Sequence, residues 1–216
     1  MHIIESSTPT NYHHQLHIPD TFLATNNIMG STKDPAFIVS PVTDASTVEK
    51  HLTSLRVLLQ HCVNDEPDIS SLGFLAPLTD HTATSYWLEL LSSVIGPRAT
   101  TTLLIATAPS SDQVIATVQL ARMSKETHAF KGEVRKLMVH PDYRRYGLGR
   151  RMMDEAERVA REEFGMEMLL LDTSRETPAR LFYLRTGWTE WGICPDYAKS
   201  SSGVKHDCCF FCKSLV

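Results

Sequence analysis

The chain has 216 residues, of which 42% are hydrophobic and 21% are charged, and its formal net charge is −4. This size suits one domain with a full apolar core, and the acidic balance gives no general reason to expect a nucleic acid partner. No apolar run approaches the ~18 residues that a membrane-spanning helix needs, and the first residues lack a basic region followed by an apolar core. We therefore expect a cytoplasmic protein without a membrane partner, either a monomer or a homodimer.

Residues 1–35 are rich in Ser, Thr, Asn and His and show no sustained hydrophobic period. We expect an irregular N-terminal extension there and a single domain over residues 36–216. His13, His14 and His17 could bind a metal at helical spacing, but a histidine cluster in a polar segment is more often solvated. We therefore expect no metal.

Residues 36–216 predict a mixed α/β domain of the α+β type. Runs of apolar and β-branched residues predict strands at residues 36–42, 101–108, 113–123, 133–139, 166–172 and 207–213. Apolar residues at helical spacing predict helices at residues 48–62 and 83–94, and a third that begins at Gly147 and Gly149 and continues to about residue 164. Residues 109–112 predict a hairpin turn, and residues 124–131 a loop.

Five cysteines are present, and four of them lie late in the chain, at Cys194, Cys208, Cys209 and Cys212. A metal site could use these thiols with His206, but no second Cys-x-x-Cys or His pair stands at the spacing of a zinc site. The favoured interpretation is a strand at residues 207–213 whose thiols pack as small apolar groups. Reduced thiols are typical of the cytosol or nucleus.

The most informative segment joins the strand at residues 133–139 to the helix that follows it. Pro141 ends the strand because it has no backbone N–H, and Gly147 and Gly149 let the backbone approach a ligand closely. The helix directs its free N–H groups and the positive end of its dipole into this loop. Four arginines crowd the same end, where cations are unfavourable unless an anion is bound: Arg144, Arg145, Arg150 and Arg151. The loop therefore predicts a bound phosphate.

Two other phosphate-binding loops fit this segment less well. A dinucleotide fingerprint would need a third glycine where Met152 stands, and Asp172 meets its acidic position only loosely. A Walker loop would end in Gly-Lys-Ser/Thr, which the segment lacks.

Arg144, Gly147 and Gly149 match the acyl-CoA signature of the GNAT superfamily of N-acyltransferases, Arg/Gln-x-x-Gly-x-Gly/Ala. Residues 179–188 are similar to a later motif of that family, a short helix that carries a tyrosine and closes with glycine and an aromatic residue. The chain resembles most closely the tabtoxin-resistance acetyltransferase group, at residues 71–76, 133–143, 171–173, 195–198 and 210–213. The resemblance implies a GNAT-like mixed central sheet flanked by helices, and N-acetylation of a small amine with acetyl-CoA as acyl donor.

The resemblance also implies a base. An alkyl amine has a pKa of about 10 and must lose a proton before it attacks a thioester, so the enzyme needs a base or must capture the rare neutral amine. Glu133 matches the glutamate that removes this proton in many GNAT enzymes, often through water, and burial would raise its pKa towards a useful value. The alternative is an ion pair of Glu133 with Arg135 or Lys136. Asp172 is either a second acid/base or a residue that holds its loop.

Tyr183 falls where the family places the general acid that protonates the leaving thiolate, whose thiol has a pKa of about 8.5. The alternative is a purely structural aromatic residue that packs on Phe182 and Trp188. Backbone N–H groups of Met138 or Val139 are expected to bind the acetyl oxygen of a tetrahedral intermediate, so that transfer is direct and needs no covalent enzyme intermediate.

The cofactor site implied by the resemblance begins where Leu137 and Val139 would pair through their backbones with the pantetheine arm. The family carries a bulge in this strand, which would break its alternation locally. Arg145 stands where many members have glycine, so its side chain would either strain the turn or add a phosphate contact, and we favour the contact. The expected cofactor-binding residues are Leu137, Met138, Val139, Arg144, Arg145, Tyr146, Gly147, Leu148, Gly149 and Arg150.

The acceptor pocket is expected in regions that the family uses to shape its substrate site, at Phe74, Trp87, Trp191, Asp196 and Tyr197.

The favoured function is acetylation of a primary amine on a small molecule, such as a toxin, an antibiotic, an amino acid or a polyamine. Two alternatives remain open: acetylation of protein lysines or N-termini, and a non-catalytic acyl-CoA sensor. The presence of both a candidate base and a candidate acid favours an enzyme over a sensor.

Overall fold

The computed structural model of the protein describes residues 37–108 and 111–216. The predicted extension at residues 1–35, with the metal-binding alternative at His13, His14 and His17, lies outside these residues, as does part of the predicted turn at 109–112. Among the residues that are described, no helix is long and apolar enough to cross a membrane.

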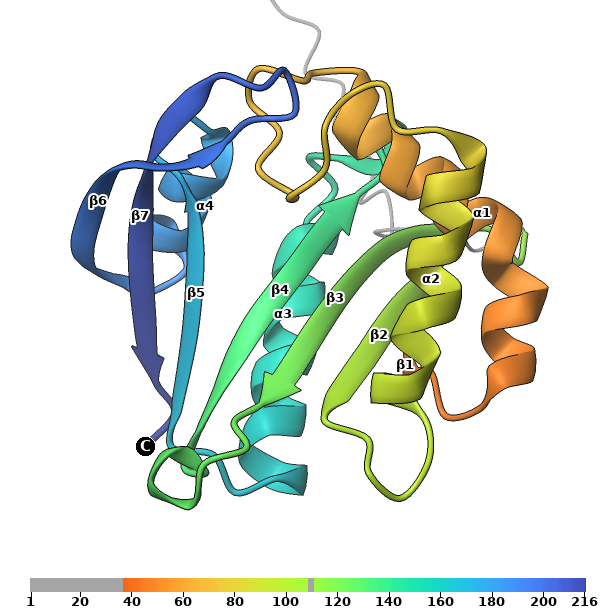
Figure 1. Ribbon diagram of the computed structural model, residues 1–216. Coiled ribbons are helices and arrows are strands. Elements are labelled where there is room, and N and C mark those ends of the chain that lie inside the picture. The colour runs from red at the N-terminus through yellow and green to blue at the C-terminus, as the bar shows by residue number, and fades with distance from the viewer. Residues whose placement is uncertain (1–36, 109–110) are drawn as a thin grey trace, which may run out of the picture. The chain divides into compact units, whose positions relative to one another are not determined.

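A seven-stranded sheet forms the centre of the domain, in the order β1-β2-β3-β4-β5-β7-β6 (Figure 1). β4 and β5 run parallel, and the other neighbouring pairs are antiparallel. The strands are β1 Ile38–Pro41, β2 Thr101–Thr107, β3 Val114–Arg122, β4 Lys131–Val139, β5 Met168–Ser174, β6 Thr189–Lys199 and β7 Lys205–Ser214.

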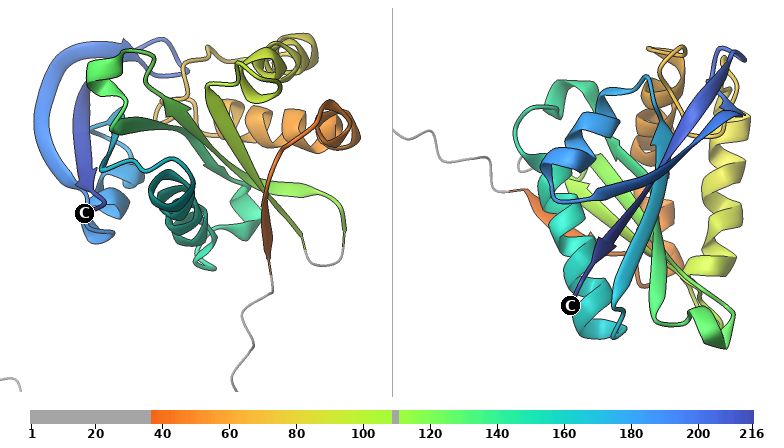
Figure 2. Two further views of the ribbon diagram at one scale, coloured as in Figure 1. Left: turned by 90° about the horizontal axis from the view of Figure 1, so that it is seen from below. Right: turned by 90° about the vertical axis from the view of Figure 1, so that its left-hand side faces the viewer.

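Four α-helices in the described ranges flank this sheet: α1 Ala45–Asn64, α2 Asp80–Val94, α3 Leu148–Arg158 and α4 Pro178–Arg185. α1 and α2 cover one face of β2 to β4, here called the front face, and α3 covers the opposite, back face (Figure 2). A π-helical turn, Val159–Glu163, continues α3, and short 3-10 turns at Glu126–His128 and Pro141–Tyr143 flank β4. The predicted fold class, a mixed sheet flanked by helices, is confirmed.

Each face of the sheet has its own apolar core, because the central strands are buried on both sides. The first eight residues of β3, from Val114 onward, are all buried. Leu55 of α1 packs in the front core, and Leu148 and Met152 of α3 pack in the back core. Continuous apolar runs are expected for strands covered on both faces, which is why the sequence predicts these strands well.

β6 is absent from the predicted strands. Its sequence contains Gly192 and Pro195, and its pairing with β7 shifts between Glu190 and Gly192 and again between Cys194 and Ala198. These irregularities break the two-residue alternation on which strand prediction depends. An edge strand tolerates such a proline, because one side of it has no ladder partner.

The start of α2 allows a local test of stability. The Thr79 hydroxyl accepts a hydrogen bond from the Thr82 N–H at 3.2 Å, so it satisfies one of the free donors of the first turn. We expect Thr79→Ala to lower the free energy of unfolding by about 1 kcal/mol, and Thr79→Ser, which keeps the hydroxyl, to change it much less. Urea denaturation followed by circular dichroism measures both values. Equal losses in the two variants would show that the cap is not the cause.

Candidate active site

β4 and β5 separate within the sheet. Their parallel pairing covers three positions, from Lys131 opposite Met168 to Glu133 opposite Leu170, and the strands then diverge towards their C-terminal ends (Figure 1). Beyond Glu133, β4 keeps its strand partner on the β3 side, but no strand of the described ranges pairs with it on the β5 side. An extended ligand arm can pair with the backbone along such an edge, as an added strand does. We call this divergence the split.

A β-bulge in β4 lies beside the split. The pairing with β3 shifts between Thr117 and Gln119, so that Lys136 and Leu137 together lie opposite a single β3 residue. Lys136 takes a φ of 50°, in the left-handed region that residues other than glycine seldom adopt. The bulge that the resemblance implied is therefore present in this chain.

The bulge decides which side chains face which side of the sheet. Val134 packs in the back core, so its neighbours Glu133 and Arg135 project to the front face. After the bulge, Leu137 and Val139 pack against the back core instead. Glu133, the candidate base, is thus on the front face, while the apolar end of β4 after the bulge lies towards α3.

The loop after β4 brings the N-terminus of α3 to the end of that strand. Gly147 is the N-cap of α3 and has a φ of 73°, which glycine adopts without steric cost. A Cβ at Gly149 would lie 3.7 Å from Val139 Cγ2 and 3.9 Å from Phe182 Cζ. Among the residues that the structure describes, no side chain caps the first-turn N–H groups of α3, so these donors are available to an anion. The predicted helix start at the two glycines is confirmed.

Arg144 ties the loop to the rest of the domain. Its Nε donates to the Val139 carbonyl at 3.1 Å, and its Nη1 donates to Glu66 at 3.0 Å. The guanidinium therefore connects the end of β4 with the segment that follows α1. In this arrangement Arg144 positions the loop.

The side chains of Arg145 and Arg150 are freer than that of Arg144. Within residues 37–108 and 111–216, Arg145 forms no ion pair, and Arg150 is loosely paired with Asp154 at 3.9 Å. Arg145 has a φ of 70°, so the turn does adopt the conformation for which glycine is better suited. Leu148 is buried, so only its backbone can contact a ligand, whereas Tyr146 is exposed.

Tyr183 lies on α4 and is buried in the back core. Its buried ring contacts Phe182, Trp188 and Phe211, at centroid distances of 5.3, 5.9 and 5.7 Å. Burial raises the pKa of the phenol above its ordinary value, and the Asp172 carboxylate raises it further. The phenol therefore keeps its proton at neutral pH and can act as a donor. The structural packing considered as the alternative is present as well.

Glu133 forms an ion pair in the structure. Its carboxylate accepts a hydrogen bond from the Arg135 guanidinium, and 24% of its side chain remains exposed. This hydrogen bond is the main reason why the pKa of Arg135 is raised. The ion pair named as the alternative is thus present, and a water molecule can still reach the carboxylate.

Asp172 lies across the split on β5. Its carboxylate is exposed and accepts a hydrogen bond from the Cys208 thiol at 3.3 Å. Burial raises the pKa of Cys208, and the Asp172 carboxylate raises it further. The same carboxylate acts electrostatically on Arg135, Lys136 and Tyr183. Asp172 is therefore coupled to two cations of β4 across the split and to the protonated Tyr183 and Cys208 on its own side.

The segment between α1 and α2 covers the bulge. Lys136 Nζ donates to the Leu72 carbonyl and lies 5.4 Å from the centroid of the Phe74 ring. Phe74 packs edge-on against Tyr86 of α2 at 5.1 Å, and the Tyr86 hydroxyl accepts a hydrogen bond from Gln119 Nε2 at 2.7 Å. Tyr86 and Gln119 were not predicted. The only sequence signal for Tyr86 is its position next to Trp87 in an aromatic pair.

The predicted acceptor residues are divided between core and surface. Trp87 is 1% exposed in the front core, so the structure does not bring it to the site. A step of one residue turns a helical side chain by about 100°, which explains why its neighbour Tyr86 lies on another side of α2. Trp191 and Tyr197 are exposed on β6, and Asp196 is exposed with a φ of 50°.

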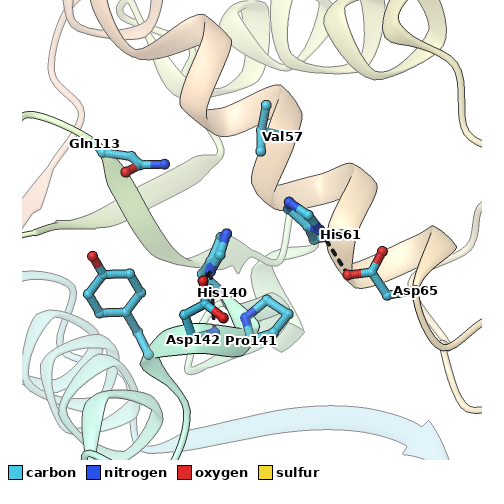
Figure 3. Close-up of a pocket in the computed structure, with 8 residues that line it drawn as sticks. Val57, His61, Asp65, Gln113, His140, Pro141 and Asp142 are labelled. Atoms are coloured by element: carbon cyan, nitrogen blue, oxygen red, sulfur yellow. Dashed lines mark hydrogen bonds and ion pairs between the residues drawn. The ribbon is translucent and has the colours of Figure 1, made fainter.

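A separate pocket of about 370 Å³ lies between α1 and the residues that follow β4 (Figure 3). In it, His61 pairs with Asp65 at 2.8 Å, and the His140 ring meets the His61 ring edge-on at 4.9 Å. Burial lowers the pKa of His140, and His61 lowers it further. In the described part of the chain, no group of three or more His, Cys, Asp or Glu side chains could hold a metal ion.

Comparisons with known proteins agree with this geometry. Residues 99–190 match the family model of the acetyltransferase (GNAT) domain. A ribosomal-protein-alanine N-acetyltransferase from Brucella melitensis is 21% identical, with a TM-score of 0.62 over 82% of this chain and 99% of that one. A protein assigned as a phosphinothricin N-acetyltransferase is 16% identical, with a TM-score of 0.61 over 84% and 99%. A protein assigned as an acetyltransferase from Salmonella typhimurium, solved with its cofactor acetyl-CoA, is 13% identical, with a TM-score of 0.61 over 83% and 94%.

The sequence identities to these solved structures are between 13% and 21%, so the likeness establishes the fold alone. The protein therefore has the fold of the GNAT acetyltransferases, and the match to the family model covers the segment from β2 to the start of β6. That segment contains the split, the glycine loop, Asp172 and Tyr183.

Proposed function

We propose that the protein is an acetyl-CoA-dependent N-acetyltransferase that acts on a primary amine of a small molecule. The observation that carries this proposal is the position of the α3 N-terminus, with its uncapped N–H groups, at the end of a strand whose β5 side is unpaired. Acetyl-CoA has a matching shape, because its pyrophosphate is an anion and its pantetheine arm is an extended chain with amide groups. It supplies a thioester acyl group ready for transfer.

In this proposal, the protein groups divide the work along the split. The first turn of α3 and Arg145 hold the pyrophosphate, and the β4 edge pairs with the arm. An N–H of Met138 or Val139 donates to the acetyl oxygen. As the C–N bond forms and the C–S bond breaks, a carboxylate, Glu133 or Asp172, takes the amine proton directly or through water, and Tyr183 donates to the leaving sulfur.

A small acceptor is favoured over a polypeptide by three backbone hydrogen bonds near the split. Ala76 N–H donates to Ser201 O at 2.8 Å, Ser201 N–H to Ser70 O at 3.0 Å, and Ser202 N–H to Pro67 O at 3.0 Å. They join the α1–α2 segment to the β6–β7 turn, so a polypeptide crossing there would have to break them. The similar proteins leave both acceptor classes open, a polypeptide and a small molecule, because one of them is named for a ribosomal protein and another for phosphinothricin.

The proposal extends to the setting of the enzyme. All five cysteines are free, as expected in a reducing compartment such as the cytoplasm. The resemblance to the tabtoxin-resistance group suggests detoxification of an amine-bearing toxin or antibiotic as the role. We expect a monomer or a homodimer that needs no metal, no nucleic acid and no membrane for activity.

Calorimetry with acetyl-CoA tests the proposal first, followed in the same sample by release of free thiol against small amines, amino acids and peptides. Binding with thiol release that depends on a small amine is the expected result. Release with peptides alone would establish the protein acetyltransferase instead. Binding without release by any acceptor would favour the acyl-CoA sensor, and no binding would overturn the assignment of the loop.

Arg145→Ala should weaken the affinity for acetyl-CoA about 2- to 10-fold, with little change in kcat. The substitution removes one charge near the expected pyrophosphate, so the difference should shrink at high ionic strength. Arg98→Ala, which removes an exposed arginine between α2 and β2, is the matched control. If both variants bind as the parent protein does at low salt, Arg145 makes no phosphate contact.

A further inference from the structure

Three aromatic rings gather on one face of β6 and β7. The centroid of Phe210 lies 5.6 Å from that of Trp191 and 5.0 Å from that of Tyr197. Trp191 is 61% exposed and Tyr197 is 54% exposed, although their combined apolar area would be more stable out of water. We call Trp191, Tyr197 and Phe210 the aromatic platform. A cluster of exposed rings of this kind marks a binding surface more often than isolated surface residues do.

The backbone of β6 is irregular at both exposed rings of the platform. Trp191 is the extra residue between Glu190 and Gly192, and the second shift in pairing, between Cys194 and Ala198, includes Tyr197. The Glu190 side chain projects to the opposite face, where its carboxylate accepts two hydrogen bonds from Arg180 of α4, at 2.7 and 3.1 Å. Bulges of this kind re-aim side chains and are common next to active sites.

Gly192 leaves the centre of the platform open. It lies directly opposite Phe210, and a Cβ built on it would meet no heavy atom within 4 Å. A larger residue at this position would project over the neighbouring ring. The glycine therefore keeps room for a flat group against Phe210.

The platform begins beside the candidate catalytic groups. Phe210 is the direct cross-strand partner of Asp172, and directly opposed residues of an antiparallel pair project to the same face. Leu171 and Phe211, the adjacent pair, pack in the back core, so Asp172 and Phe210 project to the front. A molecule lying on the platform would thus have one end next to Asp172 at the split.

We propose that the aromatic platform binds an aryl ring of the acceptor, so that the preferred substrate is an arylalkylamine whose primary amine lies at Asp172. This inference rests on the proposed function and names the substrate class for it. Aromatic pairs add about 0.5–1.5 kcal/mol beyond the area that they bury, and a flat ring can cover Trp191 and Phe210 together. The class is distinct from aliphatic polyamines, which carry several cations and no ring.

Asp172 is the carboxylate that the amine of such an acceptor would meet at the split. Arg135 and Lys136 lie on β4 across the split, and both are electrostatically coupled to Asp172. Arg175 pairs with Asp207 at 3.2 Å near the other end of the platform. Arg135 is paired with Glu133 and Arg175 with Asp207, so Asp172 is the carboxylate left to bind a single amine at this end of the platform.

The test compares 2-phenylethylamine with 2-cyclohexylethylamine, which has the same carbon skeleton without aromaticity, and with spermidine. We expect kcat/KM for the aromatic amine to be about 2- to 10-fold higher than for its cyclohexyl analogue, and about 10-fold or more higher than for spermidine, which has no ring. Trp191→Ala should raise KM for 2-phenylethylamine at least 10-fold without changing acetyl-CoA affinity, and Trp191→Phe should retain most of the affinity. Ile193→Ala is the matched control, because Ile193 is 42% exposed on the same strand but lies opposite Cys209, on the other face.

Equilibrium binding separates this inference from the proposed function. Calorimetry with 2-phenylethylamine and the full-length protein, in the presence of CoA, needs no turnover. Binding that is lost in Trp191→Ala and kept in Ile193→Ala supports the platform even if no acetylation occurs. Absence of binding, equal binding of the three amines, or binding that is insensitive to Trp191 overturns the platform, even if another amine is acetylated.

Discussion

Tyr183→Phe should lower the rate of acetyl transfer roughly 10²-fold or more and leave the affinity for acetyl-CoA nearly unchanged. The substitution removes the phenol oxygen and keeps the ring, so the packing on Phe182, Trp188 and Phe211 is retained. Burial raises the pKa of this phenol, so it is protonated throughout the neutral range. The loss of rate should therefore be similar from about pH 6 to pH 9.

The raised pKa also refines the role proposed for Tyr183. The phenol is a weaker acid than the thiol of CoA, whose pKa is about 8.5, so complete proton transfer to the thiolate is unfavourable in equilibrium terms. A hydrogen bond from a buried donor still stabilises the negative charge that develops on sulfur as the C–S bond breaks. We therefore expect the main contribution of Tyr183 to be this hydrogen bond, with the proton moving late.

Single-turnover measurements with saturating acetyl-CoA and an active amine separate this effect from product release. Tyr143→Phe is the matched control, because the Tyr143 hydroxyl forms no hydrogen bond with another residue of the described ranges. That variant should transfer acetyl groups at close to the parent rate. If Tyr183→Phe does so too, Tyr183 is a structural aromatic residue and the donor lies elsewhere.

The sequence predicts those parts of the fold in which local pattern and burial agree. Strands β2, β3 and β5 have long apolar runs, and α3, which begins after Gly147, has a clear apolar face. Glycine, proline and the arginine cluster mark the loop between β4 and α3 without any knowledge of the tertiary structure. This part of the candidate site could therefore be predicted, because its chemistry depends on backbone groups next to each other in the chain.

The remainder of the site depends on contacts between distant segments. Arg144 is a loop residue in sequence, but its partner Glu66 follows α1, so no local pattern could show that the two side chains meet. Trp87 and Tyr86 are equally plausible as ligand contacts from sequence, and only the packing of α2 buries one of them. Strand β6 is irregular at the positions that expose Trp191 and Tyr197, so the feature that hides the strand from prediction also forms the platform.

Gly149→Trp should abolish acetyl-CoA binding in calorimetry. Gly149 lies in the first turn of α3, and even a Cβ there would approach Val139 and Phe182 at ordinary contact distances, 3.7 and 3.9 Å. An indole has no room beside these side chains, so it must project towards the loop where we place the pyrophosphate. It would exclude the phosphates from the helix N–H groups by volume alone.

Two further variants keep this result interpretable if the tryptophan disturbs folding. In Gly149→Ala the added Cβ makes only ordinary contacts, and alanine favours the helix by up to about 1 kcal/mol, so the fold should be kept or stabilised. Its acetyl-CoA affinity should fall between those of the parent protein and Gly149→Trp. Arg161→Trp places the same indole at an exposed position of the π-helical turn that continues α3, and this variant should bind acetyl-CoA normally. A folded Gly149→Trp variant with parent affinity would mean that the pyrophosphate does not lie at the start of α3, since no anion could reach those N–H groups past the indole.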